Sequence, residues 1–260
     1  MIVLSYCVIF CSGYYERNGH YSKFKFKFKF KSRYKFKIKS NIRILGFYLC
    51  IALIPQVSYQ QKATYYREGT GKKLLYVLHG YGQLAKFFIR KFKQLGEEYT
   101  IIAPEGQHYF YLEGTSDRVG ASWMTKENRE QDIENYINYL DAIRAEISQE
   151  QEWKEVNILG FSQGVATAFR WIAEGEISPS KFLICSGLVP PDVDLKIKKD
   201  IFDPIKMTYF SGVNDPYRTE DSVTEFYDAV ASSKLNMDLV NFEGVHEVFV
   251  EGIVKVLNKE

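Results

Sequence analysis

The feature that most constrains the fold is an alternation, over residues 57–260, of continuous apolar runs and amphipathic stretches. The apolar runs cover residues 72–80, 99–106, 156–162, 181–187, 205–212 and 237–244. Runs of this kind are typical of parallel strands that are buried on both faces. Amphipathic helices are expected at 85–96, 128–148, 163–174, 220–234 and 246–259. The pattern predicts a single α/β domain, with a mostly parallel central sheet and helices on both of its faces.

In such a sheet the functional groups lie in loops beyond the carboxyl ends of the strands. One of these loops reads Gly160-Phe161-Ser162-Gln163-Gly164, between a predicted strand and a predicted helix. Glycines two positions to either side of a serine permit the close backbone approach of a sharp strand-to-helix turn. The sequence therefore predicts that Ser162 is a nucleophile.

A serine nucleophile needs a base, usually a histidine that is itself oriented by a carboxylate. His246 follows the last predicted strand, and Asp215 lies in a turn just past the fifth; Asp192, after the fourth, is the alternative acid. The separations of 53 residues from Ser162 to Asp215 and 31 from Asp215 to His246 leave room for the intervening elements. The chain order Ser162, Asp215, His246 is that of α/β-hydrolase triads.

Two backbone N–H groups are expected to bind the oxyanion of the reaction. The N–H of Gln163 lies at the start of the helix after the serine, where the helix dipole favours negative charge. The second is expected from Tyr81, in the loop that follows the first strand. Gly80 and Gly82 of the same loop are predicted to lie beside the substrate, and His79 is predicted to be a structural hydrogen-bonding residue.

Five segments together resemble a known family, namely LHGYGQ, GFSQG, CSGLVP, SGVNDP and EGVHEV. They are similar to the small α/β-hydrolases of the phospholipase/carboxylesterase group, which includes bacterial carboxylesterases and acyl-protein thioesterases. The resemblance covers about residues 70–260 and implies ester or thioester hydrolysis by Ser162, Asp215 and His246. The polar segment DPYRTED, the residue Val165 and the segment VHEV depart from the family pattern, and these departures bear on the substrate class.

The resemblance also implies that Trp123 borders the substrate pocket, the alternative being a tryptophan that packs in the interior. Tyr109, Phe110 and Tyr111 are expected to form an apolar wall that binds an acyl group. The longest insertion, residues 106–127, leaves no room for a sizeable lid. An open, shallow site for small or flexible substrates is therefore expected.

Charge and cysteine content exclude several function classes. Residues 1–60 carry 11 basic side chains and one acidic side chain, whereas the other 200 residues carry 23 basic and 31 acidic side chains. The slightly acidic domain has no basic patch that favours a nucleic-acid partner. Beyond residue 60 the only cysteine is Cys185, in an apolar run where a buried, inert thiol is expected. We expect no metal and no cofactor, because the sequence contains no cluster of ligand residues for one.

Residues 1–56 are predicted to be an extension outside the fold, with residues 57–260 as the hydrolase domain. The extension alternates aromatic residues with lysine over residues 22–40, which favours low-complexity sequence over a cationic strand that binds anionic membrane. The uncharged run of 12 residues at 44–55 is too short to span a bilayer. It suits the apolar region of a signal peptide, although no small-residue cleavage site follows. Translation upstream of the true start is a third alternative.

These observations predict a serine hydrolase that cleaves carboxylic esters or thioesters of a small-molecule substrate. Acyl transfer or amide cleavage on the same triad, and a non-catalytic binding protein of the same fold, are the alternatives. A cytoplasmic location is expected, or export or membrane association if residues 1–56 act as a signal or anchor. Any contact with a membrane is expected only through residues 1–56. The sequence does not predict an oligomeric state.

Overall fold

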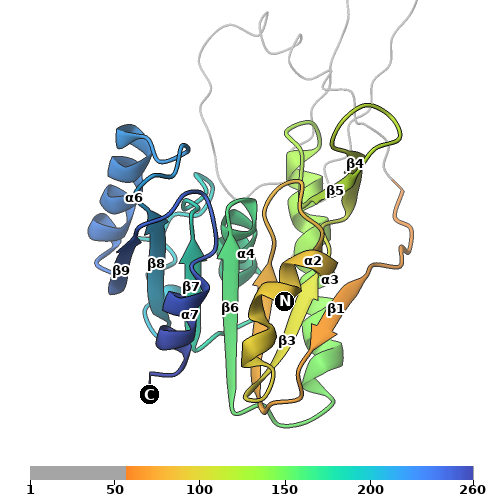
Figure 1. Cartoon of the computed structure of the whole chain (residues 1–260), viewed down its shortest axis with the longest axis horizontal. Helices are drawn as coiled ribbons and strands as arrows, with labels where there is room; N and C mark the ends of the chain where they lie inside the picture. The colour runs from red at the N-terminus through yellow and green to blue at the C-terminus, as the bar shows by residue number, and fades with distance from the viewer. Residues whose placement is uncertain (1–56, 260) are drawn as a thin grey trace, which may run out of the picture. The chain divides into compact units, whose positions relative to one another are not determined.

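The fold is built on a seven-stranded sheet with the order β1-β3-β2-β6-β7-β8-β9 (Figure 1). This is a computed structural model that describes residues 57–259, so the predictions for residues 1–56 lie outside the described residues. From β3 to β9 all neighbouring strands are parallel, and β1 pairs antiparallel with β3 at one edge. The mostly parallel sheet predicted from the apolar runs is confirmed.

The strands of this sheet are β1 (Tyr65–Glu68), β2 (Lys73–Leu78), β3 (Tyr99–Pro104), β6 (Glu155–Phe161), β7 (Lys181–Cys185), β8 (Lys206–Gly212) and β9 (Met237–Phe242). A separate two-stranded sheet pairs β4 (His108–Tyr111) with β5 (Val119–Ser122). The helices are α2 (Ala85–Phe88), α3 (Arg129–Ser148), α4 (Gln163–Glu174), α5 (Lys199–Phe202), α6 (Glu220–Ser233) and α7 (Val250–Leu257), with the 3₁₀ helix η1 (Ile89–Leu95) after α2. None of these helices is long and apolar enough to cross a membrane.

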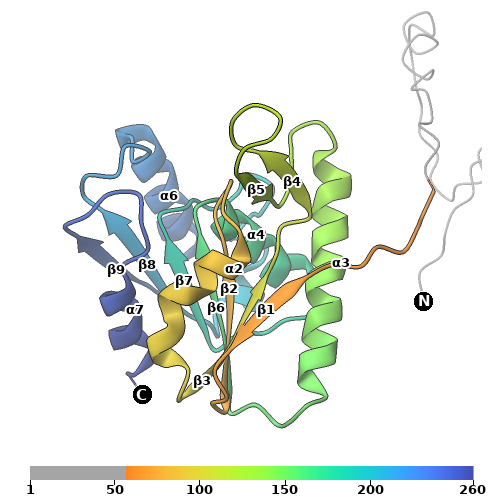
Figure 2. The same cartoon turned by 45° about the vertical axis from the view of Figure 1, so that its right-hand side comes forward.

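Helices cover the sheet on both faces, and each face has its own apolar core. On one face α3, α4, α5 and α6 pack against side chains such as Tyr76 and Ile158. On the other face α2, η1 and α7 pack against Val77 and Leu159, the next residue along each strand. Figures 1 and 2 show the two layers of helices on either side of the sheet. This two-sided burial is the reason that the strands read as continuous apolar runs.

Two predicted helices differ from the structure. The helix expected over 85–96 has only one α-helical turn and continues as the 3₁₀ helix η1. Its buried residues Ile89, Phe92 and Leu95 are spaced by three, which matches the 3.0-residue turn of a 3₁₀ helix. The last helix begins at Val250 and not at His246, so the histidine lies in the loop that follows β9.

Candidate active site

The sharp turn predicted around Ser162 is present between β6 and α4. Ser162 has φ 53° and ψ −116°, a positive φ that L-residues avoid at a cost of about 1 kcal/mol. A Cβ on Gly160 would lie 2.7 Å from the Gly164 carbonyl oxygen, and one on Gly164 would lie 2.2 Å from the carbonyl oxygen of Leu78 in β2. The two glycines are required because backbone passes where a side chain would stand. The turn thus places Ser162 beyond the carboxyl end of the sheet.

Asp215 and His246 form a partly buried carboxylate–imidazole pair. The His246 Nδ1 lies 2.7 Å from the Asp215 Oδ2, and Asp215 is only 8% exposed. The other carboxylate oxygen accepts the N–H of Tyr217 at 2.8 Å. A carboxylate bonded to Nδ1 holds the proton there and leaves Nε2 as the nitrogen that can accept a proton. The acid and the base predicted from the sequence are therefore brought together.

The loops that carry this pair meet because of Gly212, the last residue of β8. A Cβ on Gly212 would lie 2.4 Å from the Val245 carbonyl oxygen. Two backbone bonds of 3.0 Å join the loops, from Val213 N–H to the Phe242 carbonyl and from Asn214 N–H to the Gly244 carbonyl. The sequence analysis did not single out Gly212, although a glycine directly after an apolar run is a signal of close backbone approach.

The His246 ring also contacts the turn that carries the serine. It packs on the Phe161 ring with centroids 5.0 Å apart and against the Tyr217 ring at 4.7 Å. Phe161 directly precedes Ser162, so this contact joins the loop of His246 to the turn that carries the serine. Ser162, Asp215 and His246 line the same cavity.

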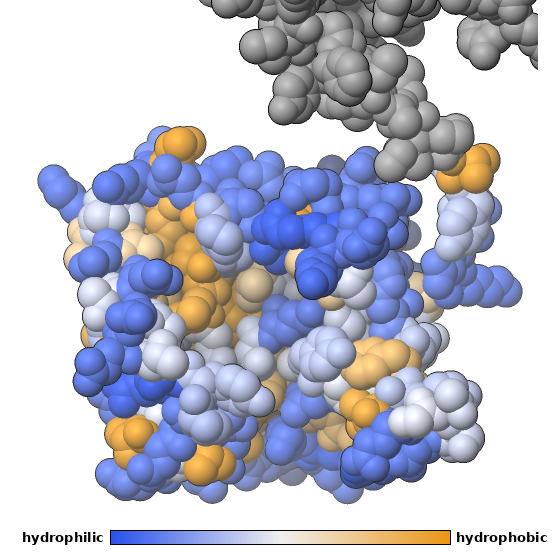
Figure 3. Space-filling view, turned by 90° about the horizontal axis from the view of Figure 1, so that it is seen from above, coloured by the Kyte–Doolittle hydropathy of each residue, from blue (hydrophilic) through white to orange (hydrophobic). Residues whose placement is uncertain are grey.

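This cavity has a volume of about 1070 Å³ and extends from Ser162 towards α6. Its outer part is lined by the loop after β7 and by α6. These contribute polar side chains, such as Lys196 and Glu225, and apolar ones, among them Leu188, Val189, Val193, Leu195, Val223 and Ala229. Figure 3, which looks down on this end of the sheet, shows hydrophobic residues gathered in a hollow on the side of α6 and β8. The apolar wall predicted at residues 109–111 is absent from the lining of this cavity, and Tyr109 and Tyr111 are 58% and 50% exposed.

The backbone N–H of Tyr81 is oriented by the buried side chain of His79. The Gly80 carbonyl accepts the His79 Nδ1–H at 2.8 Å and the Gln83 N–H at 3.2 Å. In a planar trans peptide the N–H points opposite to the carbonyl, so the Tyr81 N–H points away from the buried imidazole. Gly80 and Tyr81 both line the cavity.

The contacts of the other ring nitrogen, Nε2, show which nitrogen of His79 donates to the Gly80 carbonyl. His79 Nε2 lies 2.9 Å from the Gly106 N–H, which donates to it, and 3.3 Å from the Glu105 Oε1. The Glu105 Oε1 itself accepts the Ala85 N–H at 2.8 Å. Because the Gly106 N–H donates to Nε2, the ring proton is on Nδ1, which donates to the Gly80 carbonyl. His79 is thus the structural hydrogen-bonding residue that the sequence predicted.

Two residues predicted to lie beside the substrate do not line the cavity. Trp123 is completely buried, and its indole N–H donates to the His79 carbonyl at 2.8 Å. It is an interior residue, the alternative considered for it. Gly82 has φ 74° and donates its N–H to the Ala121 carbonyl, so it shapes the loop without facing the cavity.

Asp192, the alternative acid, is committed to an ion pair. Both of its carboxylate oxygens accept hydrogen bonds from Arg170, at 2.8 and 2.9 Å, and one also contacts Arg129. The hydrogen bonds from Arg170 lower the Asp192 pKa to about 2. Asp192 therefore braces the loop after β7 against α4, and no histidine is bonded to it. Among residues 57–259 there is also no group of three or more acidic, histidine or cysteine side chains that could hold a metal ion.

A parallel sheet covered on both faces, with a serine on a strained turn and a histidine–aspartate pair beside it, defines the α/β-hydrolase class. The model of one family, the serine hydrolase family FSH1, matches residues 70–249. The chain belongs to this serine hydrolase family, in agreement with the resemblance to phospholipase/carboxylesterase-type hydrolases.

Solved structures of esterases share this fold. A carboxylesterase from Mesorhizobium loti is 14% identical with a TM-score of 0.61, and covers 76% of this chain and 95% of its own. The Bacillus cereus carboxylesterase is 15% identical with a TM-score of 0.56, and the match covers 75% of this chain and 91% of the carboxylesterase. The Zea mays acyl-protein thioesterase 2 is 17% identical with a TM-score of 0.55, and the match covers 76% of this chain and 96% of the thioesterase. No curated protein matches the sequence. At these identities the likeness is one of fold.

Proposed function

We propose that this serine hydrolase cleaves carboxylic ester or thioester bonds through an acyl-enzyme on Ser162. The observation that carries the proposal is the 2.7 Å pair of Asp215 and His246 in the cavity that also holds Ser162. A serine hydroxyl becomes an effective nucleophile when a positioned imidazole takes its proton. The cavity supplies that combination.

In the proposed reaction the His246 Nε2 accepts the proton of the Ser162 hydroxyl while the serine oxygen attacks the carbonyl carbon. Asp215, bonded to Nδ1, holds the imidazole in position and stabilises the imidazolium. The C–O or C–S bond then breaks, and the imidazolium gives its proton to the departing alcohol or thiol. A water molecule repeats the sequence on the acyl-enzyme, releasing the carboxylic acid and regenerating Ser162.

The negative charge that develops on the carbonyl oxygen needs two donors. The N–H of Gln163 begins α4, and the N–H of Tyr81 comes from the neighbouring loop. Among residues 57–259 neither N–H donates to a protein acceptor. Both donors are therefore available to the oxyanion, and donors fixed in advance are worth about 10²- to 10³-fold each in rate.

The apolar part of the cavity suits the acyl group of the substrate. It begins at Ser162 and continues between the loop after β7 and α6, lined by Val193, Leu195, Val223 and Ala229. Burying an aliphatic chain there would contribute about 0.8 kcal/mol per methylene group. We therefore propose aliphatic acyl esters or thioesters as the substrates.

Labelling of the full chain with a fluorophosphonate probe tests the proposal. The probe is expected to label the wild-type protein, to leave Ser162→Ala unlabelled and to label His246→Ala much more slowly. Ser186→Ala is the matched control, because Ser186 also follows a strand of the sheet, has φ 48° and belongs to the cavity lining. Its hydroxyl is buried, so its loss should leave labelling unchanged.

Folded wild-type protein that does not react would contradict the hydrolase mechanism and favour a binding protein of the same fold. If labelling succeeds, a panel of esters, thioesters and amides with acyl chains of two to about twelve carbons identifies the bond that is cleaved. Product analysis with added alcohols separates hydrolysis from acyl transfer.

A further inference from the structure

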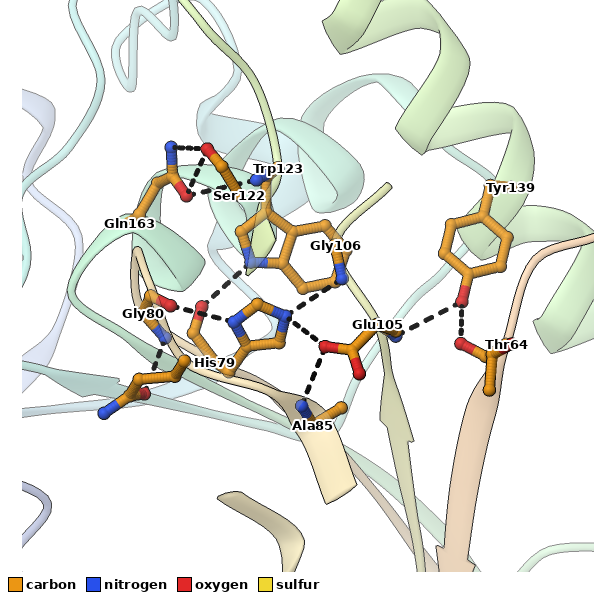
Figure 4. A network of polar contacts seen from close by, with 11 residues as sticks. Thr64, His79, Gly80, Ala85, Glu105, Gly106, Ser122, Trp123, Tyr139 and Gln163 are labelled. Carbon is orange, nitrogen blue, oxygen red and sulfur yellow. Dashed lines mark hydrogen bonds and ion pairs between the residues drawn. The ribbon is translucent and has the colours of Figure 1, made fainter. Parts of the chain in front are cut away.

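Trp123, at the end of β5, is bonded to both segments that carry the proposed oxyanion donors. Its indole N–H donates to the carbonyl of His79, two residues before Tyr81, at 2.8 Å. Its backbone N–H donates to the side-chain oxygen of Gln163, whose own backbone N–H is the other donor, at 3.1 Å. Figure 4 shows the tryptophan between the two segments, with one bond to each.

The tryptophan is itself held firmly. It is completely buried, and its ring packs on the rings of His79 and Tyr136 with centroids 5.0 and 6.3 Å away. Tyr136 belongs to α3, so the indole is also held by a helix outside the two loops. A buried side chain with a hydrogen bond to each of two loops couples the position of one loop to that of the other.

Further bonds tie the same two segments to β5. The Gln163 amide NH₂ donates to the Ser122 hydroxyl at 3.0 Å and to the Met124 carbonyl at 3.2 Å. On the other side the Gly82 N–H donates to the Ala121 carbonyl at 2.9 Å. Residues 121–124 therefore hold both segments in place, and among them Trp123 is bonded to the segment of Tyr81, through the His79 carbonyl, and to the side chain of Gln163.

We propose that Trp123 is a positioning residue that sets the separation of the two oxyanion donors, Tyr81 N–H and Gln163 N–H. The inference rests on the proposed function and deepens it. An oxyanion hole is effective because its donors are already in place when charge develops, and a misplacement of about 1 Å costs about 10²-fold in rate. A residue that fixes two donors without touching the substrate should act on the transition state and not on substrate binding.

Trp123→Phe in the full chain is the test, since it removes the indole N–H but keeps an aromatic ring. Trp171→Phe is the matched control. Trp171 is also completely buried, and its indole N–H also donates a bond of 2.8 Å, to Asp141, at the end of α4 away from the cavity. Both variants lose one hydrogen bond from a buried indole and the same volume, so both should lower the melting temperature.

Only Trp123→Phe should impair the chemical step. We expect kcat to fall by about tenfold with KM unchanged, because a displaced donor should cost less than a donor that is removed altogether. Affinity for an alkyl boronic acid, which forms a tetrahedral adduct on the serine, should fall by a similar factor. Affinity for the ether analogue of the substrate, which has no carbonyl, should stay constant. Trp171→Phe should leave all three quantities unchanged.

Gln163→Met provides a second test that does not depend on the folding of Trp123→Phe. It removes the bond from Trp123 to the residue 163 side chain, together with the amide bonds to Ser122 and Met124, while keeping the backbone N–H of residue 163. The same loss of kcat and of boronic-acid affinity is expected, and the double variant should lose less than the product of the two single effects.

Equal kinetics in Trp123→Phe and Trp171→Phe, with a shared loss of melting temperature, would overturn the inference and leave Trp123 a packing residue. So would unchanged boronic-acid affinity in Gln163→Met. A wild-type protein that neither reacts with the fluorophosphonate nor hydrolyses esters would refute the proposed function instead.

Discussion

The two halves of the cavity are held together in different ways. Around the proposed oxyanion donors, buried side chains such as His79 and Trp123 bond to the backbone of neighbouring loops. Around Asp215 and His246, the loops are joined mainly backbone to backbone, and side chains such as Tyr217 are 73% exposed. Donors to a developing charge must be fixed in advance, whereas a proton acceptor needs only a correct orientation. Activity should therefore depend on single hydrogen bonds in the half around the oxyanion donors. In the half around Asp215 and His246 it should depend on the path of the loops and on the Asp215 carboxylate.

The largest effect is expected from the carboxylate in the second half. Asp215→Asn keeps the shape of the side chain but removes the charge that holds the His246 tautomer, so kcat should fall by about 10⁴-fold. Steady-state hydrolysis of a short-chain ester measures the change. Asp192→Asn is the control, because Asp192 is bonded to Arg170 and not to a histidine. A decrease of similar size in Asp192→Asn would show that the acid was assigned wrongly.

A smaller effect should follow from disturbing the loops without touching the pair. In Gly212→Ala the new methyl group would lie 2.4 Å from the Val245 carbonyl oxygen, so the loop carrying His246 must move. We expect kcat to fall by about 10²-fold and the free energy of unfolding by about 2 kcal/mol.

Gly114→Ala is the control for Gly212→Ala. Gly114 has φ 60° and no neighbour within 4 Å of a new Cβ, so only its backbone strain of about 1 kcal/mol should appear. Activity that survives in Gly212→Ala would mean that the His246 loop adapts, and that this half of the cavity tolerates more movement than its bonding indicates.

The half of the cavity around Asp215 and His246 should also determine which lengths of acyl chain the protein accepts. Ala229→Trp on α6 would fill the outer part of the cavity, so the ratio of kcat/KM for decanoate over acetate esters should fall about tenfold or more. The acetate ester serves as the internal control, since its acyl group does not reach α6. A uniform loss for all chain lengths would argue that the acyl group lies elsewhere.

The sequence predicted the sheet and the positions of Ser162, Asp215 and His246 because these depend on local patterns. Apolar runs reveal strands buried on both faces, and the parallel sheet brings their carboxyl ends to one edge. What could not be predicted depends on contacts between distant segments. The backbone approach at Gly212 and the burial of Trp123 each involve a partner far away in the chain.

Trp123 and residues 109–111 illustrate the limit. Their aromatic character indicated a pocket wall, yet the β4–β5 pairing leaves Tyr109 and Tyr111 exposed while Trp123 is completely buried. Composition alone cannot distinguish the two outcomes, because aromatic residues occur both in cores and at binding sites. Apolar residues that do line the cavity, such as Val193, Val223 and Ala229, lie in the loop after β7 and on α6, and the sequence analysis did not single them out.

The smallest expected effect concerns the ion pair that braces the loop after β7. Hydrogen bonds from Arg170 lower the Asp192 pKa from 3.8 to about 2, so folding favours the charged form of this carboxyl. The stabilisation is fully present above pH 4 and is lost as the pH falls through about 2. Since Asp192 is partly exposed, Asp192→Asn should lower the free energy of unfolding by only about 1 kcal/mol at pH 7. Urea unfolding between pH 7 and pH 2.5 should show the difference from the wild type shrinking as the pH falls, and a constant difference would assign the loss to packing and not to charge.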